Sequence, residues 1–109
     1  MELKELPGAE LILPGLEDLH NGNSETVGAL LIAIASTRLT EAGLNFPTSH
    51  LISEPELTLY DLLQNDRDDA YPYYNALLSS LNSFCNALEL AKAASQYIGT
   101  AERKASMRL

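Results

Sequence analysis

Hydrophobic positions in the second half of the chain recur with the spacing of an α-helix. From about Tyr71 onward they alternate in steps of three and four residues, which keeps one stripe of side chains facing the same partner. The stripe comprises Tyr74, Leu77, Leu81, Phe84, Leu88, Ala91, Ser95 and Ile98, and Leu78 and Cys85 widen it. Gly99 follows and is typical of a helix C-terminus. The pattern predicts a long helix over residues 71–98.

A second segment is hydrophobic on all sides. Residues 28–35 contain no polar side chain, and a helix of this kind is usually buried by its neighbours. Asn23 or Ser24 offers an N-cap, and Gly43 offers a C-terminal stop. We therefore predict a central helix over residues 23–42.

A third, shorter helix is predicted by a local capping pattern. Ser53 and Glu56 have the spacing of a capping box, in which both side chains accept hydrogen bonds from backbone amides at the helix start. Pro55 is tolerated in the first turn, where amides lack helical partners. The helix is expected to end near Asn65, and its apolar face comprises Leu57, Leu59, Tyr60, Leu62 and Leu63.

The first 22 residues contain two turn signals, Pro7-Gly8 and Pro14-Gly15. Residues 9–13 between them fit a short strand or an extended segment, and residues 16–20 fit one or two helical turns. The whole pattern predicts an all-α fold, a small up-and-down bundle of three main helices plus a short N-terminal helix or extended arm. We expect an arm over 1–22, the bundle over 23–98 and a basic, flexible tail over 99–109.

Charge is distributed unevenly along this acidic chain, whose formal net charge is −8. The segment 54–69 contains one cation, Arg67, and the carboxylates of Glu54, Glu56, Asp61, Asp66, Asp68 and Asp69. An acidic body repels phosphate, so direct nucleic-acid binding is disfavoured. Solubility and a basic protein partner are the two explanations that remain. The cations near the C-terminus, Arg103, Lys104 and Arg108, are too few to predict membrane binding.

Two predicted helical stretches contain no charged residue at all. They are Thr26–Thr37 and the nineteen residues Ala70–Leu88, whereas solvated helix faces normally present Lys, Glu or Arg. The non-apolar face of the longer stretch offers only Asn75, Ser79, Asn82, Ser83 and Asn86. Burying such neutral polar groups costs less than burying charges. These five residues are therefore a candidate interface, and a homodimer is the simplest symmetric use of it.

The tyrosines form the one aromatic cluster in the sequence. Tyr71, Tyr73 and Tyr74 begin the last predicted helix, and Tyr60 lies in the helix before it. Aromatic rings beside polar groups stack ligands or anchor interfaces, and they also close the end of a helical core. We place a candidate ligand pocket among Tyr60, Tyr71, Tyr74 and His50, near the loop around Phe46.

No motif for catalysis or metal binding is present. An EF-hand counted from Asp66 requires Gly and Glu where Tyr71 and Leu77 stand. His20 and His50 lack a second ligand at zinc spacing. The single cysteine, Cys85, falls on the apolar side of a helix, where a thiol is inert. We expect no enzyme activity, no cofactor and no metal.

The functional expectation is a protein-interaction module that forms a homodimer in the cytoplasm. The N-terminus lacks the basic flank and apolar core of a signal peptide. The longest apolar stretch, residues 27–35, is too short to span a bilayer, so no membrane association is expected. Two alternatives remain: an acidic inhibitor or antitoxin-like protein that occupies a basic surface of its partner, and a small-molecule-binding protein that uses the tyrosine cluster.

Overall fold

The computed structural model describes residues 3–49 and 51–107, with side chains described through Ala94. A 3₁₀ turn, η1 (Leu3–Glu5), precedes five α-helices. These are α1 (Ala9–His20), α2 (Val27–Ile34), α3 (Ser36–Glu41), α4 (Pro55–Asp66) and α5 (Ala70–Met107). The described residues contain no strand, and the predicted all-α fold class is confirmed.

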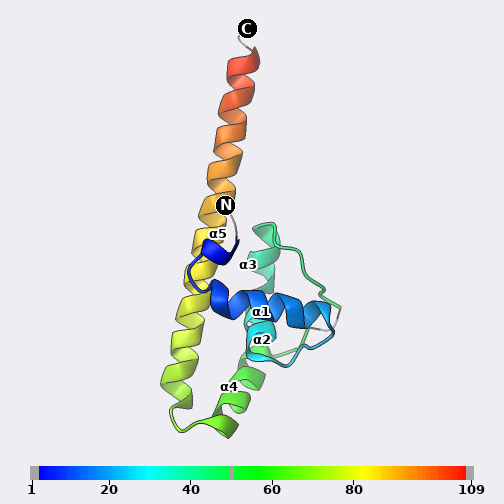
Figure 1. Ribbon diagram of the computed structural model, residues 1–109, viewed down its shortest axis with the longest axis vertical. Coiled ribbons are helices and arrows are strands. Elements are labelled where there is room, and N and C mark those ends of the chain that lie inside the picture. The colour runs from blue at the N-terminus through cyan, green and yellow to red at the C-terminus, as the bar shows by residue number, and fades with distance from the viewer. Residues whose placement is uncertain (1–2, 50, 108–109) are drawn as a thin grey trace.

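The helices pack as a short crossed bundle on one long rod (Figure 1). Helices α4 and α5 form an antiparallel hairpin, and α2 and α3 stand beside α5 on the same side as α4. Helix α1 lies across this group rather than along it, so the arrangement is not up-and-down throughout. The molecule measures 63 × 28 × 20 Å, and its longest dimension follows α5.

Helix α1 runs through a proline and a glycine that predicted a turn. Pro14 lies inside the helix and is exposed, so its ring faces solvent rather than a neighbouring helix. Gly15 is buried because it contacts Gly28 of α2 backbone to backbone: a Cβ at Gly15 would lie 2.3 Å from the Gly28 carbonyl carbon. The N-terminal segment is therefore a helix and not an extended arm, and its packing on α2 overrides the local turn signal.

The central apolar segment is helical and buried, as predicted, but it is divided. Helix α2 ends at Ile34, and Ala35 joins it to α3 with φ −105° and ψ 22°. The N-cap is Thr26 and not Asn23 or Ser24. Its hydroxyl accepts from the Ala29 amide at 3.2 Å and donates to Asp18 Oδ2 at 2.7 Å. This side chain both starts α2 and connects it to α1.

The capping box predicted at Ser53 does not form. Helix α4 is preceded by Glu54 in the left-handed conformation (φ 55°), with no side-chain cap, and Pro55 occupies the first turn as expected. The helix ends at Asp66, one residue beyond the predicted Asn65.

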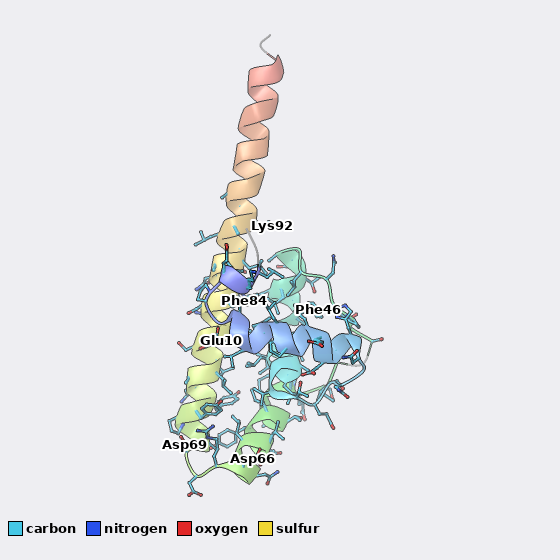
Figure 2. The ribbon with its side chains drawn as sticks, viewed as in Figure 1. Glu10, Phe46, Asp66, Asp69, Phe84 and Lys92 are labelled. Atoms are coloured by element: carbon cyan, nitrogen blue, oxygen red, sulfur yellow. The ribbon has the colours of Figure 1, made fainter. Side chains whose placement is uncertain are left out.

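The core lies where α1, α2, α4 and α5 meet. Its largest fully buried side chains are Phe84, Ile12, Leu30, Leu31, Ile32, Leu39, Leu59 and Cys85. Phe84 projects from α5 toward the start of α1 (Figure 2). The predicted stripe of α5 supplies Leu77, Leu81, Phe84 and Leu88 to this core, and its members Ser95 and Ile98 lie beyond the described side chains.

Helix α5 continues past Gly99 to Met107, although Gly99 predicted a stop. Beyond about Lys92 it extends alone, away from the other helices (Figures 1 and 2). Among the described residues, no helix combines the length and the apolarity that a bilayer span requires.

Candidate functional site

The five candidate interface residues lie together on the outer face of α5. Asn75, Ser79, Asn82, Ser83 and Asn86 are all exposed. Their spacing of three, four and seven residues places them on one side of the helix, away from the buried Leu77, Leu81 and Phe84.

Two of the five residues have a partner within the same chain. The guanidinium of Arg38, on α3, donates from Nη1 to Asn82 Oδ1 at 3.0 Å and from Nη2 to Asn86 Oδ1 at 2.9 Å. It also donates two hydrogen bonds to the carboxylate of Glu89, from Nε to Oε2 at 3.1 Å and from Nη2 to Oε1 at 2.7 Å. This Arg38 clamp joins α3 to α5 along one edge of the candidate interface.

Arg38 is a site residue that the hydrophobic and charge patterns did not predict. One signal was available: Arg38 is the only cation between Lys4 and Arg67. Hydrogen bonding and ion pairing with Arg38 lower the pKa of Glu89, and the same contact raises the pKa of Arg38. Both charges are therefore held in their ionised states at neutral pH.

Lys92 provides a second contact from α5 to α3. Its ammonium donates to the backbone carbonyl of Glu41, in the last turn of α3. The two charged residues that follow the neutral stretch, Glu89 and Lys92, are thus both directed toward α3. Glu89 and Lys92 are the only charged residues of α5 between Asn75 and Ala94, where the described side chains end. The edge of the outer face at Asn75, Ser79 and Ser83 is therefore uncharged, whereas Asn82 and Asn86 border Arg38.

The outer face also includes Leu90, which the sequence analysis overlooked. Leu90 is 71% exposed, the highest value among the large hydrophobic side chains described. It lies one turn beyond Asn86 and two turns beyond Ser83. Leu90 therefore adds apolar surface to a stripe that otherwise consists of Asn, Ser and Ala.

A groove of about 260 Å³ runs between α5 and the α2–α3 junction. Its lining residues are Ile34, Ala35, Thr37, Arg38, Leu78, Leu81, Asn82 and Cys85. Cys85 is buried, as predicted, and burial raises the pKa of its thiol. A thiol held in this protonated form is a poor nucleophile.

The tyrosine cluster forms a pocket on the α4–α5 hairpin, near the loop that connects the two helices. The ring of Tyr60 stands at 82° to the rings of Tyr71 and Tyr74, with centroids 6.4 and 5.5 Å away. Glu56 and Leu57 complete a cavity of about 340 Å³. The structure thus places three of the four predicted pocket residues together and adds two from the first turn of α4.

The other residues named for this pocket are elsewhere. His50 lies outside the described residues. Phe46 packs against the core far from the hairpin end that Asp66 and Asp69 mark (Figure 2). Tyr73 points to a different side, where the Arg67 guanidinium lies 3.6 Å from its ring centroid and pairs with Asp69 at 2.6 Å.

The remaining candidates show local roles. His20 Nδ1 lies 2.7 Å from the Leu16 carbonyl, one turn earlier in α1. The carboxylates of segment 54–69 are all exposed, on α4 and at its two ends. In the described part of the chain, no three His, Cys, Asp or Glu side chains lie close enough to hold a metal ion.

Comparisons with known proteins add nothing about the outer face of α5 or the tyrosine pocket. No protein-family model, no curated protein sequence and no solved structure matches this chain.

Proposed function

We propose that this protein is a helical interaction module that forms a homodimer through the outer face of α5. The observation behind the proposal is the direction of charge on this helix. Glu89 and Lys92 both contact α3. Asn82 and Asn86 border the same contact through Arg38, and a neutral stripe remains along the other edge, at Asn75, Ser79 and Ser83. The stripe from Asn75 to Ala94 is roughly 30 Å long at 1.5 Å per residue.

The length of α5 supports the same proposal. The helix has 38 residues, and its last turns extend beyond all other elements. A single helix in water is only marginally stable, because most helical stability in proteins comes from packing. A second copy that lies along α5 would cover both the neutral stripe and the extended turns. A cyclic two-fold pair is the commonest way to do so.

The oligomeric state at micromolar concentration tests the proposal. We expect sedimentation velocity to show a dimer for the wild-type chain and a monomer for Ser83→Glu, because the new charge would be buried in the interface. Gln64→Glu adds the same charge to an exposed position on α4 and is the matched control, expected to remain dimeric. A wild-type monomer throughout the concentration range would refute the proposal.

Asn82 is a less suitable test position than Ser83. A glutamate at Asn82 would gain an ion pair with Arg38, which already bonds Asn82 at 3.0 Å.

The proposal includes no catalytic activity. It places the protein in the cytoplasm, since a single unpaired and buried cysteine is typical of a reducing compartment.

The exposed carboxylates support a second candidate, binding to a basic surface of another protein. They are spread over the solvent side of α4 and both of its ends. A triple variant, Asp61→Asn, Asp66→Asn and Asp68→Asn, would weaken salt-sensitive binding to such a partner. The control removes three exposed carboxylates elsewhere: Glu10→Gln, Glu17→Gln and Glu25→Gln. Equal loss in both variants would contradict a specific acidic site.

A further inference from the structure

The tyrosine pocket has the geometry of an aromatic corner. The ring of Tyr60 is perpendicular to the rings of both Tyr71 and Tyr74, so the walls meet at 82°. Aromatic rings attract cations to their faces, within about 6 Å of the ring centroid. Perpendicular rings let a single rounded cation contact several rings at once.

A carboxylate stands at the same corner. Glu56 lines the cavity together with Leu57, and the five described lining residues include no Lys or Arg. The pKa of Tyr74 is raised, first by burial and second by the negative charge of Glu56, so that charge acts directly on the pocket wall. Arg67, in the loop between α4 and α5, lies on Tyr73 and pairs with Asp69.

Core packing does not account for the exposed members of this site. Tyr60 and Tyr74 are half-buried and contact the core, but Tyr71 is 65% exposed and Leu57 is 61% exposed. A tyrosine and a leucine with this much surface in water contribute little to the core. Their positions are instead those of the outer walls of a shallow apolar pocket.

We propose that Tyr60, Tyr71, Tyr74 and Glu56 bind a quaternary ammonium group. The rings contact its methyl groups, and the carboxylate of Glu56 balances its charge. A quaternary ammonium fits better than a primary one, because its charge is spread over methyl groups that need no hydrogen-bond acceptors. A lysine ammonium is compact and strongly hydrated, so it would lose more hydration on entering the pocket. Two kinds of ligand carry this group, a free small molecule and a trimethylated lysine.

The decisive comparison uses two ligands of the same shape. Choline carries a trimethylammonium group, and 3,3-dimethyl-1-butanol replaces its nitrogen with carbon and has no charge. In an NMR titration of the full chain, we expect choline to bind about tenfold more tightly than the neutral alcohol. This ratio corresponds to about 1.4 kcal/mol of cation–π and charge attraction. The choline methyl protons should shift upfield as they enter the ring faces.

Variants separate the contributions of charge and aromatic surface. Glu56→Gln should weaken choline binding severalfold and leave the neutral alcohol unaffected. Asp61→Asn removes the same charge from α4 outside the pocket and should change neither. Tyr71→Ala, at an exposed position, should weaken both ligands without unfolding the protein. A trimethyllysine peptide that binds more tightly than choline, with the unmethylated peptide silent, would identify a modified lysine as the source.

Two results would overturn the inference. One is equal affinity for choline and the neutral alcohol, which would mean that the pocket recognises apolar shape alone. The other is no shift of the Tyr60, Tyr71 or Tyr74 ring signals at millimolar choline. Tyr71 lies one turn before Asn75, on the same side of α5. Both measurements are therefore repeated on Ser83→Glu, the variant that the proposed dimer interface would make monomeric, so that the oligomeric state does not affect the result.

Discussion

At the scale of single residues, two glycines determine how closely α1 and α2 approach each other. Gly15 and Gly28 meet where α1 crosses α2, and a Cβ on Gly28 would lie 2.7 Å from the backbone of Gly15 and from the Leu11 carbonyl oxygen. Backbone atoms cannot move aside as a flexible side chain can. The two helices approach closely only because both positions lack a side chain.

We expect Gly15→Ala to destabilise the protein by about 3 kcal/mol or more, because the added methyl group forces the helices apart. Chemical denaturation monitored by circular dichroism measures the effect. Gly22→Asn is the control: Gly22 has open space around it and φ +85°, a conformation that Asn tolerates. Equal stability of Gly15→Ala and wild type would show that the crossing is looser than described.

Because of the buried thiol of Cys85, we expect the stability of the fold to decrease as the pH rises in the alkaline range. Burial raises its pKa above the ordinary value of 9.0, so the folded state favours the protonated thiol. This stabilisation is complete below the ordinary pKa and is lost as the pH rises through the folded-state pKa. We expect the free energy of unfolding to fall in this range for the wild type and to fall less steeply for Cys85→Ala. A thiol that reacts equally fast in folded and denatured protein would contradict its burial.

At the scale of secondary-structure elements, helix α5 has a buried hydrophobic side and an exposed side. Leu81 is 4% exposed. Leu81→Ala should therefore cost about 2–5 kcal/mol through lost burial and the cavity that remains. Leu57→Ala, the same change at a residue that is 61% exposed, should cost far less. Similar losses in both variants, measured by urea denaturation, would mean that Leu81 does not pack in the core.

Because of the Arg38 clamp, we expect the stability of the fold to depend on pH in the acid range. The pKa of Glu89 is lowered by its bonds to Arg38, so the folded state favours the carboxylate. This contribution is present above the ordinary pKa of 4.5 and is lost as the pH falls through the lowered value. Glu89→Gln should make acid unfolding less dependent on pH, whereas Glu10→Gln on α1 should not. An unchanged acid profile in Glu89→Gln would show that the clamp is open in solution.

Element types were easier to predict from the sequence than element ends. Periodicity predicted α5, the lack of polar side chains predicted the central helix, and a capping pattern with an apolar face predicted α4, because in each case the apolar residues must be buried against neighbours. The helical path through Pro14-Gly15 depends on Gly28, which is distant in sequence, and no local rule anticipates it. No local sequence signal predicts the break at Ala35 or the left-handed Glu54 either.

The candidate sites show the same difference between local and distant contacts. Tyr60, Tyr71 and Tyr74 could be predicted together because only a short loop separates α4 from α5. The Arg38 clamp could not, since it joins residues 44 to 51 positions apart and requires the orientation of α3. Two of the five candidate interface residues therefore have an intramolecular partner that the sequence pattern does not reveal.

At the scale of the whole molecule, α5 sets the geometry of any assembly that forms along it. The rod has a direction, with the tyrosine pocket at its beginning and its free turns at its end. A two-fold axis parallel to the rod would place both pockets at the same end of a dimer. An axis perpendicular to it would place them at opposite ends.

The distance between two spin labels, one on each subunit, distinguishes these two symmetries. The chain has a single thiol, Cys85, and it is buried, so a spin label on Ala94→Cys would report from one site per subunit. Side-by-side parallel rods would bring the two labels within about 10 Å, the usual spacing of packed helix axes. Antiparallel rods centred on the neutral stripe would separate them by roughly 30 Å at 1.5 Å per residue. The unbroken length of one helix thus turns the question of head-to-head or head-to-tail pairing into a single measured distance.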